Sequence, residues 1–164
     1  MKHMIKATLI AVGMGSVWSP SLLAQTRPTQ RPAAANPPMV AACSLMSKEE
    51  VKRHLPWRPQ LDQFDAEEEQ LGSYGSACEY PSVRVQVMPF VQATIDSARK
   101  KSGIETVGGV GDEAYLYNNA NRYAELYVKV GARLLTLQAN VSGSIDEVRP
   151  GLVAMAKVLV ATLR

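Results

Sequence analysis

The sequence predicts a single α+β domain in which an antiparallel sheet of about five strands carries helices on one of its faces. Three observations lead to this fold class. Several segments after residue 76 alternate apolar with polar residues, as strands with one buried face do. Other segments space their apolar residues as amphipathic helices do. The last three predicted strands are joined by connections that suit only antiparallel neighbours, and the predicted order is αββαβββα.

The first 42 residues are expected to lie outside this domain. Residues 1–24 resemble a secretory signal peptide, with Lys2 and Lys6 at the start, an uncharged middle too short to span a membrane, and Ala24 before the predicted cut. Residues 25–42 hold four of the ten prolines and no acidic or aromatic residue, which predicts a disordered spacer. The domain is then 43–164, and we expect a periplasmic or extracellular protein with no membrane span.

Two cysteines, Cys43 and Cys78, lie in the predicted domain. In an oxidising compartment they are expected to form one disulfide, because disulfides form and persist there and the domain has two cysteines. The competing interpretation is that Val40-Ala-Ala-Cys43 is a lipobox in which Cys43 is acylated. The proline-rich spacer stands where a lipobox needs an apolar signal core, which argues against lipid anchoring.

The elements follow from local patterns along the chain. Ser47-Lys-Glu-Glu50 is a capping box for a helix over 48–55, which Pro56 stops. Residues 57–76 read as a polar connection. Val91, Ile95 and Ala98 are spaced as a helix stripe. The predicted strands are 77–80, 82–88, 113–117, 122–130 and 133–141. A second capping box, Ser144 to Glu147, begins the closing helix.

The stretch Gly109-Val-Gly-Asp-Glu-Ala114 fits the pattern of a dinucleotide-binding loop. Such a loop opens a helix, but residues 114–117 are β-prone and run into an Asn-rich turn. Asp112 and Glu113 also place negative charge where the pyrophosphate would bind. We therefore expect no cofactor, and interpret 108–111 as a tight turn that needs positive φ angles or close packing.

No catalytic or metal site is predicted. His54 is the only histidine after residue 24, it follows Lys-Arg at a helix end, and nothing in the spacing selects a serine or acid partner for it. One histidine and two cysteines cannot form a His/Cys zinc site, and the acidic run 65–69 lacks the ligand order of a calcium loop. Without Lys2 and Lys6 the 18 basic residues become 16 against 15 acidic ones, a net charge of +1 that does not favour nucleic-acid binding.

The outer face of the sheet is the candidate interaction surface. Strand alternation sends Ala124, Leu126, Val128 and Val130 to the core together with the apolar residues of 133–141. Tyrosine supplies rigid amphipathic contact area for a partner, although cross-strand tyrosines also stabilise a sheet on their own. The residues expected on the opposite face are Tyr115, Tyr117, Tyr123, Tyr127, Lys129 and Gln138.

The order of motifs also resembles known bacterial domains. Cys43-Ser-Leu before a Glu-rich helix, Cys78-Glu-Tyr entering a strand, Gly109-Val-Gly-Asp-Glu-Ala-Tyr115 and a closing apolar helix are similar to small secreted and lipoprotein domains of unknown function. They also resemble the extracellular sensor domain of receptor-type bacterial serine/threonine kinases. The resemblance implies an α+β fold with a disulfide and no known enzymatic activity, and it carries no functional residues over to this chain.

Together these patterns favour an exported noncatalytic binding or interaction module, not an enzyme. Its partner would be a protein or small ligand in the cell envelope. One alternative is an inhibitor or immunity-type protein for a secreted enzyme, and another is an enzyme of a type that the motifs do not reveal.

Overall fold

The computed structural model describes residues 37–119, 122–141 and 143–164. The predicted signal peptide and residues 25–36 of the predicted spacer lie outside the described residues. The elements in chain order are η1 (Ala42–Ser44), α1 (Lys48–His54), η2 (Pro59–Leu61), β1 (Glu67–Leu71), β2 (Gly75–Tyr80), β3 (Val83–Pro89), α2 (Gln92–Arg99), β4 (Ile104–Thr106), β5 (Glu113–Asn119), β6 (Tyr123–Val130), β7 (Arg133–Asn140) and α3 (Ile145–Leu163).

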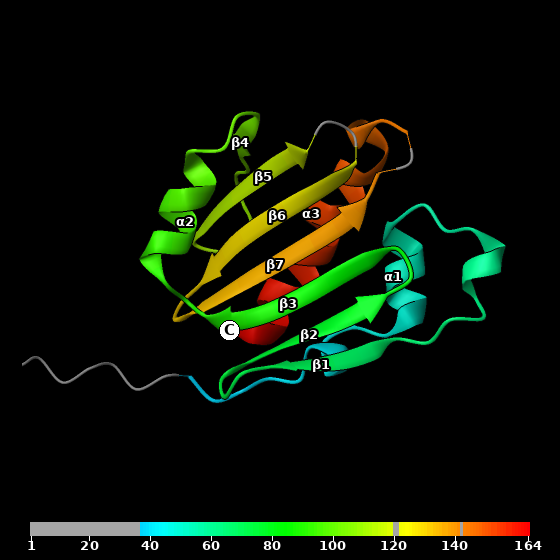
Figure 1. Ribbon diagram of the computed structural model, residues 1–164, viewed down its shortest axis with the longest axis horizontal. Helices are drawn as coiled ribbons and strands as arrows, with labels where there is room; N and C mark the ends of the chain where they lie inside the picture. Colours follow the sequence, from blue (N-terminus) through cyan, green and yellow to red (C-terminus); the bar gives the residue numbers. More distant parts are fainter. Residues whose placement is uncertain (1–36, 120–121, 142) are drawn as a thin grey trace, which may run out of the picture. The chain divides into compact units, whose positions relative to one another are not determined.

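Seven strands form one antiparallel sheet in the order β1-β2-β3-β7-β6-β5-β4 (Figure 1). The chain builds one half with β1 to β3, passes through α2 to the far edge at β4, and returns strand by strand until β7 pairs with β3. The predicted α+β class and antiparallel sheet are confirmed. The predicted count of about five strands and the order αββαβββα are wrong, because β1 and β4 were not recognised.

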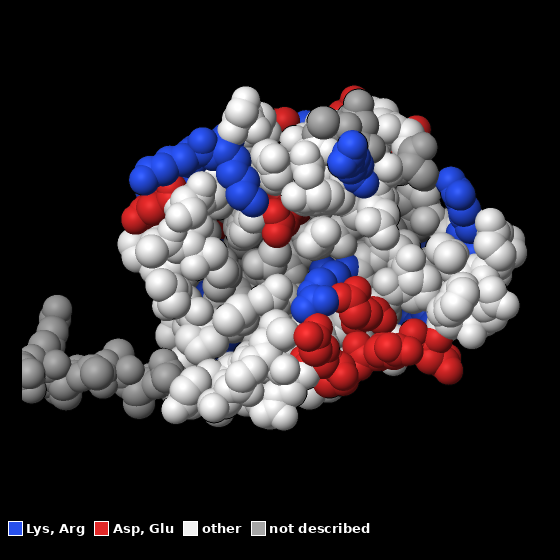
Figure 2. All heavy atoms as spheres, viewed as in Figure 1, with Lys and Arg blue, Asp and Glu red and all other residues white. Residues whose placement is uncertain are grey.

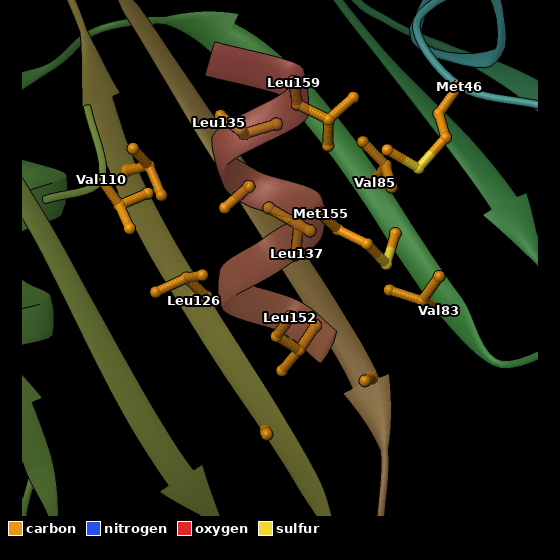
Figure 3. Packing of buried hydrophobic residues seen from close by; sticks show 14 of the residues in the cluster. Met46, Val83, Val85, Val110, Leu126, Leu135, Leu137, Leu152, Met155 and Leu159 are labelled. Atoms are coloured by element: carbon orange, nitrogen blue, oxygen red, sulfur yellow. The ribbon is translucent and has the colours of Figure 1, made fainter. Parts of the chain in front are cut away.

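The main core lies between the sheet and the helices α1 and α3. Leu152, Met155 and Leu159 of α3 point toward the apolar side chains of β3, β6 and β7 (Figure 3). All three are fully buried. The predicted core residues of 124–130 and 133–141 belong to this cluster, so strand alternation assigned these faces correctly. The side of the sheet that meets α1 and α3 is called the inner face below.

Helix α2 packs on the opposite, outer face. Ile95 and Ala98, the buried residues of α2, form a second apolar cluster with Tyr115, Tyr127 and Leu134 of the sheet. The prediction that all helices share one face is therefore wrong. Of the predicted stripe, Ile95 and Ala98 are buried, whereas Val91 is the N-cap of α2 and 54% exposed. A stripe fixes only which side of the helix is buried. The side of the sheet that it covers depends on the route of the chain from β3 to β4.

The folded part begins before Cys43. Ala42 is fully buried, and its amide donates to the Ser76 hydroxyl, which in turn donates to the carbonyl of Val40. Cys43 and Cys78 form the predicted disulfide, which ties η1 to β2. Residues 40–42 therefore pack with the domain instead of extending the spacer to residue 42.

Candidate binding face

The outer face presents one continuous row of side chains across the sheet. The strand register places Glu67, Glu79, Arg84, Gln138, Glu125 and Tyr117 in this row, in the order of the strands from β1 to β5. The next row contains Thr136 of β7 with Tyr127 and Tyr115. Figure 2 views the molecule from this side. The two rows differ in exposure because α2 lies over the second one.

The four predicted tyrosines share the outer face, as strand alternation requires, but they divide into two pairs. Tyr115 and Tyr127 lie opposite each other in the β5–β6 register and are 9% and 7% exposed beneath α2. Tyr117 and Tyr123 remain partly exposed, with their rings edge to face at 6.3 Å between centroids. Tyr115 and Tyr127 were predicted to be available to a partner, and this is wrong because α2 covers them.

The hydroxyls of the covered pair are engaged within the protein. Tyr115 accepts a hydrogen bond from Arg99 and donates one to Glu113. Tyr127 donates to Glu125 and accepts from Lys101, whose ammonium also lies 3.0 Å from the Glu125 carboxylate. Burial, together with the hydrogen bond to Glu125, raises the pKa of Tyr127 to about 12. These tyrosines anchor α2 and the residues after it to the sheet.

The Lys101 side chain lies between the covered and the partly exposed tyrosines. Its Nζ lies 4.4 Å from the centre of the Tyr117 ring and 4.8 Å from that of Tyr127, both within cation–π range. Lys129, another predicted face residue, places its Nζ 4.6 Å from the centre of the Phe90 ring. Both lysines therefore stack on aromatic rings of their own domain.

Five outer-face side chains that α2 does not bury are here called the open face: Arg84, Tyr117, Tyr123, Glu125 and Gln138. Each of these side chains is partly exposed. Beside Arg84 and Gln138 the surface forms a hollow of about 210 Å³, whose other walls include Glu79, Tyr80 and Asn140. Arg84 donates to Glu69 at 2.6 Å and to Glu79, so its guanidinium is fixed by two carboxylates. Of these groups Tyr117, Tyr123 and Gln138 were predicted as contact residues. Strand alternation also places Glu125 on the face opposite Ala124 and Leu126, and Arg84 on the face opposite Val83 and Val85.

The glycine pattern at 109–114 is a structural turn. Gly109 and Gly111 have φ angles of 72° and 61°, as the interpretation of a tight turn required. Strand β5 follows the turn at Glu113, where a dinucleotide loop would open a helix. The Asp112 carboxylate accepts the Gly131 amide, which lowers the pKa of this carboxyl, and it also contacts Arg164. The turn thus fastens β5 to the β6–β7 turn and to the end of α3.

One group of possible metal ligands occurs in the part of the chain that the structure describes, formed by Cys43, Glu68 and Cys78. The two sulfurs are joined in the disulfide, so neither is a thiolate that could bind a metal. Glu68 accepts hydrogen bonds from the amides of Ala42 at 2.8 Å and of Cys43 at 2.6 Å. The carboxylate is therefore used to hold η1 against the edge of the sheet.

Comparison of the chain with protein-family models, with curated proteins and with solved structures found no match. Among the described residues, no helix combines the length and the apolar character that a membrane crossing requires.

Proposed function

We propose that this protein is an exported, noncatalytic binding module that holds its partner on the open face. The observation that carries the proposal is the row of polar, partly exposed side chains on neighbouring strands, which borders a hollow and is left uncovered by α2. Such a surface offers several hydrogen-bonding groups held at fixed spacings by the sheet. Binding sites built on a rigid scaffold lose little entropy when they are occupied.

Two features support the noncatalytic part of the proposal. His54 lies at the end of α1 and its backbone carbonyl packs against Gly151 of α3, on the inner side of the sheet and so on the side opposite the open face. The two charged side chains of the open face are each paired with a neighbouring residue, Arg84 with Glu79 and Glu125 with Lys101. A general base needs a proton-accepting group, and a general acid a proton-donating one, within reach of a substrate, whereas each of these carboxylates is paired with a cation.

Export is supported by the signal-like residues 1–24 and by the disulfide, which persists in oxidising compartments. Intact mass spectrometry of the native protein tests this part. We expect a mature chain that starts at or near Gln25 and carries no lipid. A retained Met1 in protein from the native host would contradict it.

The binding role is tested by immobilising the mature chain and exposing it to envelope extract of the native host. We expect a saturable partner whose dissociation constant rises by about thirtyfold or more on Tyr123→Ala, the effect of losing a hot-spot side chain. Tyr74→Ala is the matched control, because Tyr74 is 53% exposed in the turn between β1 and β2. Equal binding by both variants would refute a site on the open face.

A further inference from the structure

A second hollow adjoins the open face at the β1 edge of the sheet. It measures about 320 Å³ and shares Glu79 and Tyr80 with the hollow beside Arg84. Its apolar wall consists of Leu61, Phe64, Tyr80 and Pro81, and its rim carries the carboxylates of Asp65, Glu67 and Glu79. This shallow surface, which combines apolar and acidic side chains, is called the acidic groove below. Figure 2 shows the carboxylates gathered over β1 and β2.

The rim carries more negative charge than its own cations neutralise. Glu67 and Glu79 lie directly opposite each other in the β1–β2 register, an arrangement in which like charges repel. Arg84 pairs with Glu79 but is shared with Glu69. Asp65 has an almost fully exposed side chain, and its nearest ammonium, Lys48, stands 4.0 Å away. A cation entering the groove would relieve the repulsion between the two glutamates.

The apolar wall is held in place before any partner arrives. The Phe64 amide donates to the carbonyl of Leu61, and the Phe64 carbonyl accepts from Lys48 at 2.6 Å. The same lysine donates to the carbonyl of Asp62 at 2.7 Å. Phe64 is nevertheless 53% exposed, although burying such a ring is favourable by about 1.5–3 kcal/mol. An aromatic side chain presented on a fixed backbone is typical of a contact residue for a protein partner.

We infer that the acidic groove binds an extended basic segment of a partner protein, with an apolar side chain against Phe64 and a neighbouring Lys or Arg between the carboxylates. Charge complementarity selects this occupant. A nucleic acid would bring phosphates against the acidic rim, and a second copy in a symmetric contact would bring the same carboxylates against each other. A simple cation would leave the apolar wall exposed. The inference rests on the proposed function and names the partner class for the extended site.

The test measures binding of synthetic peptides to the mature, disulfide-bonded protein by fluorescence anisotropy. The probe peptide alternates lysine with phenylalanine and leucine, and two companions replace either the lysines by glutamate or the apolar residues by serine. We expect only the lysine–apolar peptide to bind, and we expect its affinity to fall as salt is raised, because the rim charges are exposed.

Variants then locate the site. The double variant Asp65→Asn with Glu67→Gln, and separately Phe64→Ser, should each weaken the probe peptide by about tenfold. Asp96→Asn with Asp146→Asn changes the net charge by the same amount on α2 and α3, and Val158→Ser removes another exposed apolar residue, 40% exposed on α3. These controls should bind as the unmodified protein does. Thermal unfolding of each variant establishes that it is folded.

Three results would overturn the inference: equal binding of the glutamate peptide, equal binding of the serine peptide, or equal weakening by the control variants. Absence of peptide binding together with a captured partner that Tyr123→Ala releases would refute the acidic groove and leave the proposed function standing. Absence of both would refute both.

Discussion

Replacing Gly111 by alanine should destabilise the domain far more than the same change at Gly109, two residues earlier. Both glycines have positive φ angles, so each alanine pays the left-handed conformational cost of about 1–2 kcal/mol. Beyond this, the two sites differ. A Cβ at Gly109 meets nothing within 4 Å, whereas a Cβ at Gly111 would lie 2.5 Å from the Lys129 carbonyl oxygen and 2.5 Å from a Val128 methyl.

The obstacle at Gly111 cannot move easily. The Lys129 carbonyl accepts the Asp112 amide, and both Val128 and Lys129 are paired with β5 and β7 in the middle of the sheet. Overpacking of this kind costs about 1–3 kcal/mol more. We therefore expect Gly111→Ala to lower the free energy of unfolding by about 2–5 kcal/mol and Gly109→Ala by about 1–2 kcal/mol. Urea unfolding with the disulfide intact measures both, and equal losses would show that backbone conformation alone explains these glycines.

Three further changes follow from the same structure. Gly151→Ala would place a Cβ 1.8 Å from the His54 carbonyl oxygen, so it should separate α1 from α3 and lower the free energy of unfolding by at least about 3 kcal/mol in urea titrations. Reduction of the disulfide, which closes a loop with a sequence separation of 35, should cost about 4 kcal/mol, measured by unfolding with and without reductant. Burial raises the pKa of Tyr80 and of Tyr127 from 10.0 to about 12. Between these pH values the folded state keeps protons that the unfolded state has lost, so the free energy of unfolding should be unchanged below about pH 10 and should fall as the pH rises to about 12. Urea unfolding at a series of pH values, alongside ultraviolet titration of the tyrosines, measures this.

Short-range sequence patterns predicted much of this fold. Both capping boxes form, Ser47 with Glu50 and Ser144 with Glu147, because a cap needs only residues three apart. Strand faces followed from alternation, since the pleat repeats every two residues whatever lies across the sheet. The disulfide followed from the number of cysteines and the expected compartment.

The two edge strands escaped prediction for a physical reason. Strand β1 has the sequence Glu-Glu-Glu-Gln-Leu and its first four residues are exposed on both faces. A strand with no buried face has no hydrophobic period to display, and it is held by backbone pairing to β2 and by contacts such as Glu68 with η1. Strand β4 has three residues, too few for a period of two to be recognised. The acidic groove therefore depends on a strand that the sequence pattern does not reveal, whereas the residues of the open face all lie on predicted strands.

The remaining wrong prediction is that all four tyrosines of the outer face are available to a partner, and its correction leads to a last prediction. Alternation placed Tyr123 and Tyr127 on one face and treated them alike, because a tyrosine ring suits both water and a core. In the structure Tyr127 is 7% exposed beneath α2 and its hydroxyl joins Lys101 and Glu125, whereas Tyr123 stays partly exposed against Tyr117. Tyr127→Ser should thus cost about 3–5 kcal/mol, the usual loss for a buried aromatic ring, and Tyr123→Ser should cost about 1 kcal/mol or less. Urea unfolding of the two variants separates these outcomes. If both serine variants lost the same stability, α2 would not be the cover that divides this sheet face into a packed half and an exposed half.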